Sequence, residues 1–136
     1  MSTTLLPSNV ERIFRGFVSL EKIMAHYKHS PVDVFMNVSS YEGQPVSIKE
    51  AISCGIPVVA TDVGGNSEIV TSKNGILLNA NPPAREIADA LLHMLDHPDM
   101  TVQMRKESRD LWSRLYSSEV TYPRFISNLQ SIRRRT

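Results

Sequence analysis

The stretch that most constrains the fold is VSSYEGQPVSIKEAISCGIPVVATDVGG (residues 38–65), which leads from one apolar run to another through a short segment bounded by proline and glycine. The run before it, residues 32–38, is apolar with few interruptions, as is typical of a strand covered on both faces of a parallel sheet. Pro45 suits the start of a helix and Gly55 the position just past its end. The sequence therefore predicts a helix over residues 45–54.

A second strand is predicted over residues 57–63, where the chain is again apolar and then stops at a Gly-Gly pair. Two strands joined through a helix are expected to be parallel, with their carboxyl ends on the same edge of the sheet. The turn that contains Glu42 and the turn at Gly64 and Gly65 then face one cleft. In open α/β sheets that edge is where ligands bind.

Three residues near the first turn have properties that suit a ligand. Gly43 allows the backbone to approach a bound molecule closely. The helix that starts near Pro45 presents free amides and the positive end of its dipole, which suits an anion such as phosphate. Glu50 lies about 200° around this helix from Ile48, away from the core side, and is therefore available for binding.

Glu42 and Glu50 are separated by seven residues and belong to a longer pattern, S-x-x-E-G-x-P followed by E-A-x-x-x-G-x-P-V-V-A-T-x-V-G-G-x-x-E. This pattern resembles the C-terminal, donor-binding domain of retaining GT-B glycosyltransferases of family 4, and the match runs from residue 14 to residue 78. The resemblance implies a nucleotide-diphosphate sugar as donor substrate, with no cofactor and no metal. GT-B enzymes generally neutralise the leaving diphosphate with helix dipoles and basic side chains, and the chain has no Asp-x-Asp signature.

The resemblance also assigns roles to the two carboxylates. Glu50 would accept hydrogen bonds from the two adjacent hydroxyls of the ribose. Glu42 would be the catalytic residue, close to the transferred sugar, where it stabilises the positive charge that develops in the transition state. A carboxylate pair is also found in hydrolases, but with Glu50 on the nucleotide no second acid remains beside the anomeric carbon. Transfer is therefore favoured over hydrolysis.

The other donor-binding candidates come from the same resemblance. Gly16, Phe17 and Val18 would meet the base of the nucleotide, although an ordinary strand end explains them equally well. Ser39 would contact a sugar hydroxyl, although serines at a strand end more often form turns. The complete set of donor-binding candidates is Glu50, Gly43, Gln44, Pro45, Ser39, Gly16, Phe17, Val18, Gly64 and Gly65.

The predicted fold class is α/β, a three-layer Rossmann-like parallel sheet of about four strands with C-terminal helices, forming part of a GT-B C-terminal domain. Two further strands are expected within residues 10–18 and 76–78. Helices are expected over residues 20–29, 84–96, 101–115 and 122–132. The last of these is expected to face inward with Phe125, Ile126, Leu129 and Ile132.

The length of 136 residues indicates one domain, which the resemblance implies is partial, over residues 1–136 with residues 1–9 expected to be disordered. A net charge of +1 gives no general attraction to nucleic acid. A single cysteine favours a reducing cytoplasm, and no apolar run has the length of a signal peptide or a membrane span. Three arginines at residues 133–135 allow peripheral contact with anionic lipid, but a solvated tail is the favoured interpretation.

The chain departs from the family in what it lacks. A complete enzyme of this type has an acceptor-binding N-terminal domain, and its donor domain begins with a strand and loop whose Arg and Lys hold the diphosphate. We therefore expect a glycosyltransferase fragment that is inactive alone and works in a full-length parent. The alternative is a non-catalytic donor-binding module that needs a partner chain for activity. A hydrolase or epimerase acting on nucleotide sugars ranks last.

Overall fold

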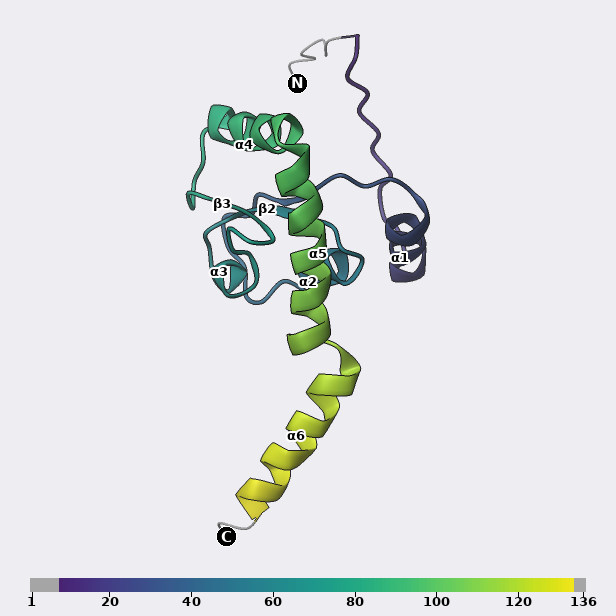
Figure 1. The fold of residues 1–136 in the computed structure, drawn as a ribbon, viewed down its shortest axis with the longest axis vertical. Coiled ribbons are helices and arrows are strands. Elements are labelled where there is room, and N and C mark those ends of the chain that lie inside the picture. Colours follow the sequence, from purple (N-terminus) through teal and green to yellow (C-terminus); the bar gives the residue numbers. More distant parts are fainter. Residues whose placement is uncertain (1–7, 134–136) are drawn as a thin grey trace.

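The computed structural model describes residues 8–133, which form three strands and six helices (Figure 1). In chain order these elements are α1 (Leu20–His29), β1 (Phe35–Asn37), α2 (Val46–Ser53), β2 (Val58–Thr61), α3 (Asn66–Ile69), β3 (Gly75–Leu78), α4 (Ala84–Asp96), α5 (Pro98–Leu115) and α6 (Ser118–Arg133).

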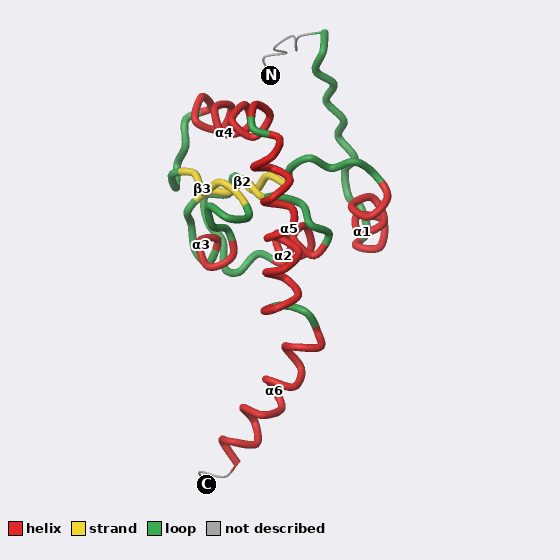
Figure 2. Tube along the Cα trace, in the orientation of Figure 1, coloured by secondary structure: helices red, strands yellow, loops and turns green. Residues whose placement is uncertain are grey.

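The three strands form one parallel sheet in the order β1-β2-β3. Phe35 pairs with Val58, and Val58 in turn pairs with Gly75. Every residue of β2 is buried, because this central strand has a neighbour on each side and helices above and below it (Figure 2). The near-continuous apolar sequence of β2 is what burial on both faces requires.

Two hydrophobic clusters cover the two faces of the sheet. On one face Ile48 and Ile52 of α2 pack with Ile69 of α3, and Trp112 near the end of α5 joins them. The other face is covered by α4 and the beginning of α5, whose apolar side chains surround Val59. The architecture is therefore α/β with three layers, as the sequence predicted.

Helix α2 (Val46–Ser53) begins one residue later and ends one residue earlier than the predicted range of residues 45–54. Pro45 is the N-cap residue, and Gly55 follows the C-cap residue Cys54 with a φ of 70°, a conformation that favours glycine. Ile48, Ala51 and Ile52 are its buried residues. The helix is thereby held against β2 with its N-terminus at the edge of the sheet where β1 ends.

Most of the predicted elements are present with small changes in length. Helices α1 and α4 have the predicted bounds, whereas α5 begins at Pro98, three residues earlier than expected. β1 and β2 are each shorter than the apolar runs that predicted them. Tyr27 of α1 packs edge-on against Phe35 with ring centroids 6.3 Å apart, in agreement with the packing role expected for it.

The strand expected within residues 10–18 is wrong, and the described sheet has three strands instead of about four. Residues 10–18 carry no strand, and Ile13, Phe14 and Phe17 are exposed. Gly16 has a φ of 59°, which interrupts an extended backbone. A strand also needs a hydrogen-bonding neighbour, and this apolar segment has not paired with the edge of β1.

The inward orientation expected for the last helix is also wrong. Phe125, Ile126, Leu129 and Ile132 of α6 are all more than half exposed. The helix extends away from the rest of the molecule (Figure 1). The apolar spacing that predicts a helix is present. However, neither the sheet nor the helices that cover it extend far enough to pack against the apolar face of α6.

Some expectations concern residues that the structure does not describe. Disorder was expected for residues 1–9, of which residues 1–7 lie outside the described part, and so do Arg134 and Arg135 of the basic tail. Within residues 8–133, none of the helices combines the length and the apolar character needed to cross a membrane.

The two-sided burial of the sheet predicts unequal effects for two apolar truncations. Ile52→Ala removes a fully buried side chain from the cluster between α2 and the sheet, so we expect the free energy of unfolding to fall by about 2–5 kcal/mol. Val102→Ala, at a side chain that is 52% exposed, should change it by less than about 0.5 kcal/mol. Urea denaturation followed by circular dichroism measures both, and similar losses would contradict this packing.

Candidate functional site

The turn after β1 and the turn after β2 are in direct backbone contact. The Gly65 amide donates a hydrogen bond to the Gly43 carbonyl at 2.7 Å. A Cβ at Gly64 would lie 1.7 Å from the Glu42 carbonyl oxygen, and one at Gly65 would lie 2.7 Å from that of Gly43. Gly64 also has a φ of 53°. The two glycines thus permit a contact that other residues would prevent, and it places both turns at the same edge of the sheet.

Glu42 is held in this turn by side chains that follow β1. Its Oε1 accepts a hydrogen bond from Asn37 Nδ2 at 3.0 Å and lies 2.7 Å from Ser39 Oγ. The Ser39 hydroxyl is also 2.6 Å from Asn37 Oδ1, and because it has one proton it donates to one acceptor at a time. A carboxylate is the stronger acceptor. The Glu42 side chain is half-buried and oriented by two neighbours.

These hydrogen bonds lower the pKa of Glu42. The larger contribution comes from Asn37 and the next from Ser39, while partial burial acts weakly in the opposite direction. Both donors are neutral, so they favour the ionised carboxylate without cancelling its charge. The turn therefore presents a negative charge at neutral pH.

Two buried side chains fix the backbone beneath this carboxylate. Thr61, at the end of β2, donates its hydroxyl to the Ser39 carbonyl at 2.6 Å. Asn66, at the start of α3, donates Nδ2 to the Thr61 carbonyl at 2.9 Å. Both residues are almost completely buried. The ends of β1 and β2 are therefore connected by side chains as well as by the sheet.

Gln44 links the first turn to its two neighbouring helices. Its side-chain amide donates to Glu68 of α3, and its Oε1 accepts from Lys49 Nζ of α2 at 2.9 Å. The Lys49 ammonium also lies 5.1 Å from the centre of the Tyr116 ring. Lys49 therefore adds a positive charge near the turn that the sequence analysis did not anticipate.

The N-terminus of α2 is open at the same edge. Pro45 makes no side-chain capping bond, and the first turn of α2 contains no acidic residue. The first amides of an α-helix have no partner inside the helix, so an anion near Val46 would meet free donors and the positive end of the dipole.

Glu50 lies further along α2, four residues after Val46 and so about 6 Å along the helix axis. Its side chain is half-buried. Burial is the main cause of the raised pKa of Tyr27, and the negative charge of Glu50 is the next. The negative charge of Glu50 thus acts on Tyr27 of α1, whereas Glu42 is hydrogen-bonded within the turn that follows β1.

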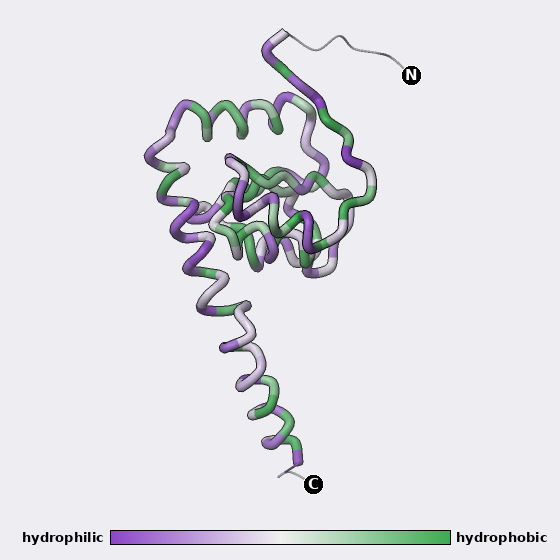
Figure 3. The backbone as a smooth tube through the Cα atoms, turned by 90° about the vertical axis from the view of Figure 1, so that its right-hand side faces the viewer, coloured by the Kyte–Doolittle hydropathy of each residue, from purple (hydrophilic) through white to green (hydrophobic). Residues whose placement is uncertain are grey.

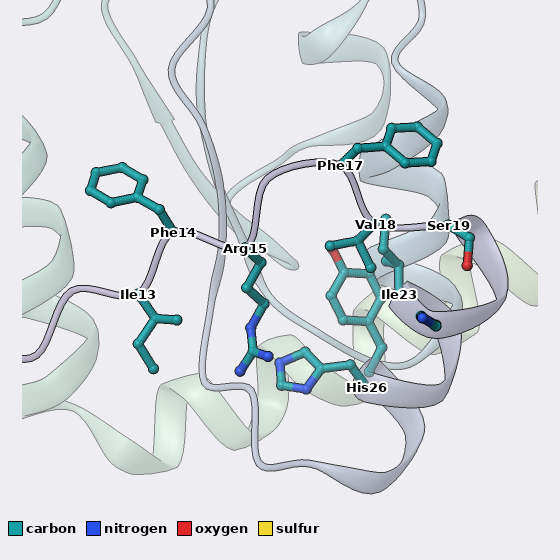
Figure 4. A pocket seen from close by; sticks show the side chains of 10 residues that line it. Ile13, Phe14, Arg15, Phe17, Val18, Ser19, Ile23 and His26 are labelled. Atoms are coloured by element: carbon teal, nitrogen blue, oxygen red, sulfur yellow. The ribbon is translucent and has the colours of Figure 1, made fainter.

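The loop of Gly16, Phe17 and Val18 leads into α1, and the loop and the helix together line an open hollow of about 810 Å³ (Figure 4). Val18 of the loop and Tyr27 of α1 both line this hollow. The ring of Phe17 points away from α1 and is 97% exposed, whereas Arg15 and His26 point toward each other (Figure 4).

The structure thus divides the predicted site residues into two groups. One group surrounds the joined turns and consists of Ser39, Glu42, Gly43, Gln44, Pro45, Gly64 and Gly65. The others are Gly16, Phe17 and Val18 in the loop before α1, and Glu50 on α2. Asn37, Thr61 and Lys49 belong with the first group and were missed. The only sequence signal for Asn37 and Thr61 is a polar residue at the end of an apolar strand.

A metal centre needs several converging ligands. Within the described residues 8–133, no three His, Cys, Asp or Glu side chains are placed to hold a metal ion.

The fold agrees with comparisons to known proteins. The chain matches the family of glycosyl transferases group 1 over residues 5–111, and it belongs to that family. Alpha-monoglucosyldiacylglycerol synthase of Acholeplasma laidlawii is 27% identical over 106 residues, which cover 77% of this chain and 25% of that protein. The chain thus spans a quarter of the length of this curated relative.

Two solved structures have a similar fold. The C-terminal domain of the group 1 glycosyl transferase LpcC from Francisella tularensis matches with a TM-score of 0.65 and 26% identity, over 76% of this chain and 52% of that one. Anabaena Alr3699/HepE in complex with UDP matches with a TM-score of 0.71 and 24% identity, over 82% of this chain and 30% of that one. The chain forms part of a GT-B glycosyltransferase domain.

The close contact between the turns predicts different effects for two neighbouring glycines. Gly64→Ala places a methyl group against the Glu42 carbonyl and forces alanine to a positive φ, so we expect a loss of more than about 2 kcal/mol of unfolding free energy. Gly43→Ala is the matched control, since nothing lies within 4 Å of its added Cβ. Urea denaturation and the amide shifts of Asn37 and Ser39 report the effect. Equal tolerance of both changes would mean that the turns do not touch.

The pKa of Glu42 provides a second prediction. The double variant Asn37→Ala, Ser39→Ala removes both hydrogen bonds, so the pKa should rise toward the ordinary value for glutamate. In the native chain the pKa of Glu42 is lower in the folded state than in the unfolded state. The ionised carboxylate therefore stabilises the fold at pH values above the unfolded-state pKa. This stabilisation is lost as the pH falls through the folded-state pKa. Carbon-13 NMR titration of the Glu42 carboxyl, in the native chain and in the double variant, measures the change. An unchanged titration curve would refute the hydrogen bonds.

Proposed function

We propose that this chain carries part of the nucleotide-sugar site of a group 1 glycosyltransferase, and that the protein to which it belongs transfers the sugar to an acceptor with retention, as enzymes of family 4 do. The observation that carries the proposal is the joined pair of turns, which holds an oriented carboxylate beside open helix amides. In open α/β sheets this edge is where ligands bind.

In this proposal Glu42 acts on the transferred sugar. Neutral hydrogen-bond donors hold its carboxylate in place and keep it ionised. A fixed negative charge of this kind can accept a hydrogen bond from a sugar hydroxyl and stabilises the positive charge of an oxocarbenium-like transition state. Ser39 and Asn37 then act by positioning Glu42.

Glu50 is proposed to bind the ribose, and the loop of Gly16, Phe17 and Val18 to meet the base. A carboxylate can accept a hydrogen bond from each of two adjacent hydroxyls. The negative charge of Glu50 contributes to the raised pKa of Tyr27, which also lines the hollow beneath the loop, and this supports a nucleoside bound between α2 and that loop. The exposed ring of Phe17 offers a stacking surface for a base.

The diphosphate is proposed to bind at the N-terminus of α2. The amides after Pro45 are open, Gly43 leaves room for close approach, and Lys49 provides a positive charge nearby. Gly64 and Gly65 shape the facing wall. We propose that no metal and no cofactor takes part, because amides, a helix dipole and basic side chains suffice to balance the diphosphate.

The second candidate is a non-catalytic donor-binding module that needs a partner chain for activity. The open edge of β1, where Met36 and Val38 are exposed, favours this candidate because an uncovered apolar edge promotes association. Turnover by the isolated chain with a nucleotide-sugar donor would argue against it. A cytoplasmic location is proposed for either candidate, on the basis of composition.

The two carboxylates should differ in what their loss affects. Glu50→Ala removes the proposed ribose contact, so the dissociation constants of UDP, GDP or ADP should rise about tenfold for the nucleotide that binds. Glu42→Ala should change nucleotide affinity less than about threefold but lower kcat of the intact glycosyltransferase at least about a hundredfold.

Calorimetry and a transfer assay measure the two effects. Asp96→Ala is the matched control, because this exposed carboxylate lies at the end of α4 on the other face of the sheet. If both glutamate variants lose nucleotide affinity equally, the two roles are wrongly assigned. If no donor nucleotide binds the native chain, the proposed site is refuted.

A further inference from the structure

The ammonium group of Lys49 lies at the open end of α2, although the residue itself belongs to the helix. Side chains on a helix point toward its N-terminus. Lys49 Nζ accordingly reaches back to within 2.9 Å of Gln44 Oε1, in the turn that precedes Pro45. The positive charge is therefore placed beside the free amides at the start of this helix.

Tyr116 provides the second contact of this ammonium group, with its ring centre 5.1 Å from Lys49 Nζ. This tyrosine is the C-cap residue of α5, and the helix that follows, α6, leads away from the rest of the molecule (Figures 1 and 3). The Tyr116 side chain packs against the cluster that contains Ile48 and Ile52, and its amide donates to the Trp112 carbonyl at 2.9 Å. Its aromatic ring is thus held in place at a distance that suits a cation–π interaction.

Glu68 fixes the direction of the Gln44 amide. The amide donates from Nε2 to the Glu68 carboxylate and accepts through Oε1 from Lys49. If the amide were reversed, its NH₂ group would face the ammonium and its oxygen would face the carboxylate, so neither hydrogen bond could form. The Gln44 oxygen is therefore directed toward Lys49.

Lys49 keeps its full positive charge in this arrangement. The Gln44 oxygen and the Tyr116 ring are both neutral, and the carboxylate of Glu68 is bonded to the other end of the amide. A helix N-terminus supplies the equivalent of only about half a positive charge, which is less than the negative charge of a diphosphate. Lysine binds phosphate as a point charge, and an ammonium group that is already held in place loses less freedom on binding.

We propose that Tyr116 is a positioning residue of the donor site, and that together with Gln44 it holds Lys49 ready to bind the phosphates of a nucleoside diphosphate. This inference rests on the proposed function, which assigns the diphosphate to the N-terminus of α2. It extends the site from the joined turns to the end of α5, where the sequence predicted no site residue. Glu68 acts one step further away, by orienting Gln44.

A double-mutant cycle tests whether Tyr116 acts through Lys49. UDP, GDP and ADP are the probes, each compared with its nucleoside, and NMR titration of the full chain measures the dissociation constants. For the nucleotide that binds, Lys49→Gln should raise the constant at least about tenfold. Tyr116→Leu should raise it about two- to fivefold in the native background, but should have no further effect in the Lys49→Gln background. Nucleoside affinity should not change, because a nucleoside has no phosphate.

Two matched variants and one ligand-free measurement serve as controls. Tyr116→Phe keeps the aromatic ring and should bind like the native chain. Lys73→Gln removes a positive charge from the turn before β3, at the opposite edge of the sheet, and should have no effect. Without ligand, the proton shifts of the Lys49 ε-methylene group should change in Tyr116→Leu but not in Tyr116→Phe. Circular dichroism verifies that each variant is folded.

The possible results separate this inference from the function on which it rests. If a nucleoside diphosphate binds but the effects of Tyr116→Leu and Lys49→Gln add in the double variant, the inference is overturned and the proposed function stands. The same holds if Tyr116→Leu has no effect, or weakens nucleoside binding equally. If none of the three nucleoside diphosphates binds the native chain, the proposed function fails and the inference fails with it.

Discussion

The hydrogen bond from the Gly65 amide to the Gly43 carbonyl is the contact on which the rest of the site depends. The parallel pairing of β1 with β2 determines where each strand ends, and this bond then joins the two turns that follow. Because neither Gly64 nor Gly65 has a side chain, the two backbones approach within a distance that a Cβ would prevent. The location of Glu42 therefore follows from strand register and backbone contact.

Helix α2 couples this site to the stability of the fold. Its inner side places Ile48 and Ile52 in the main cluster, and its N-terminus opens at the joined turns. A fully packed core fixes the helix axis, so the open amides after Pro45 are held in place by hydrophobic contacts on the other side of the same helix. Glu50 is carried by the same element, and its negative charge contributes to the raised pKa of Tyr27 on α1.

The sequence predicted those parts of the fold whose signals are local. Pro45 and Gly55 mark the ends of α2, and regular apolar spacing gives α4 its observed bounds. The strand expected at residues 10–18 failed because pairing depends on a neighbour that its own composition does not reveal. Asn37 was missed for a related reason, since its contact with Glu42 exists only after β1 has turned. For α6, spacing identified the apolar face but carried no information about what lies opposite it.

The chemistry of the joined turns depends on how Glu42 is kept ionised. A neighbouring arginine or lysine would also lower its pKa, but it would cancel the negative charge that a positively charged transition state requires. Asn37 and Ser39 instead lower the pKa with neutral donors, which leaves the charge available to a ligand. The one basic side chain bonded to this turn, among the described residues, is Lys49, and it binds Gln44 instead of Glu42. The hydrogen bonds thus direct the positive charge and the negative charge to different side chains, as the proposed binding of a diphosphate and the proposed stabilisation of a developing cation require.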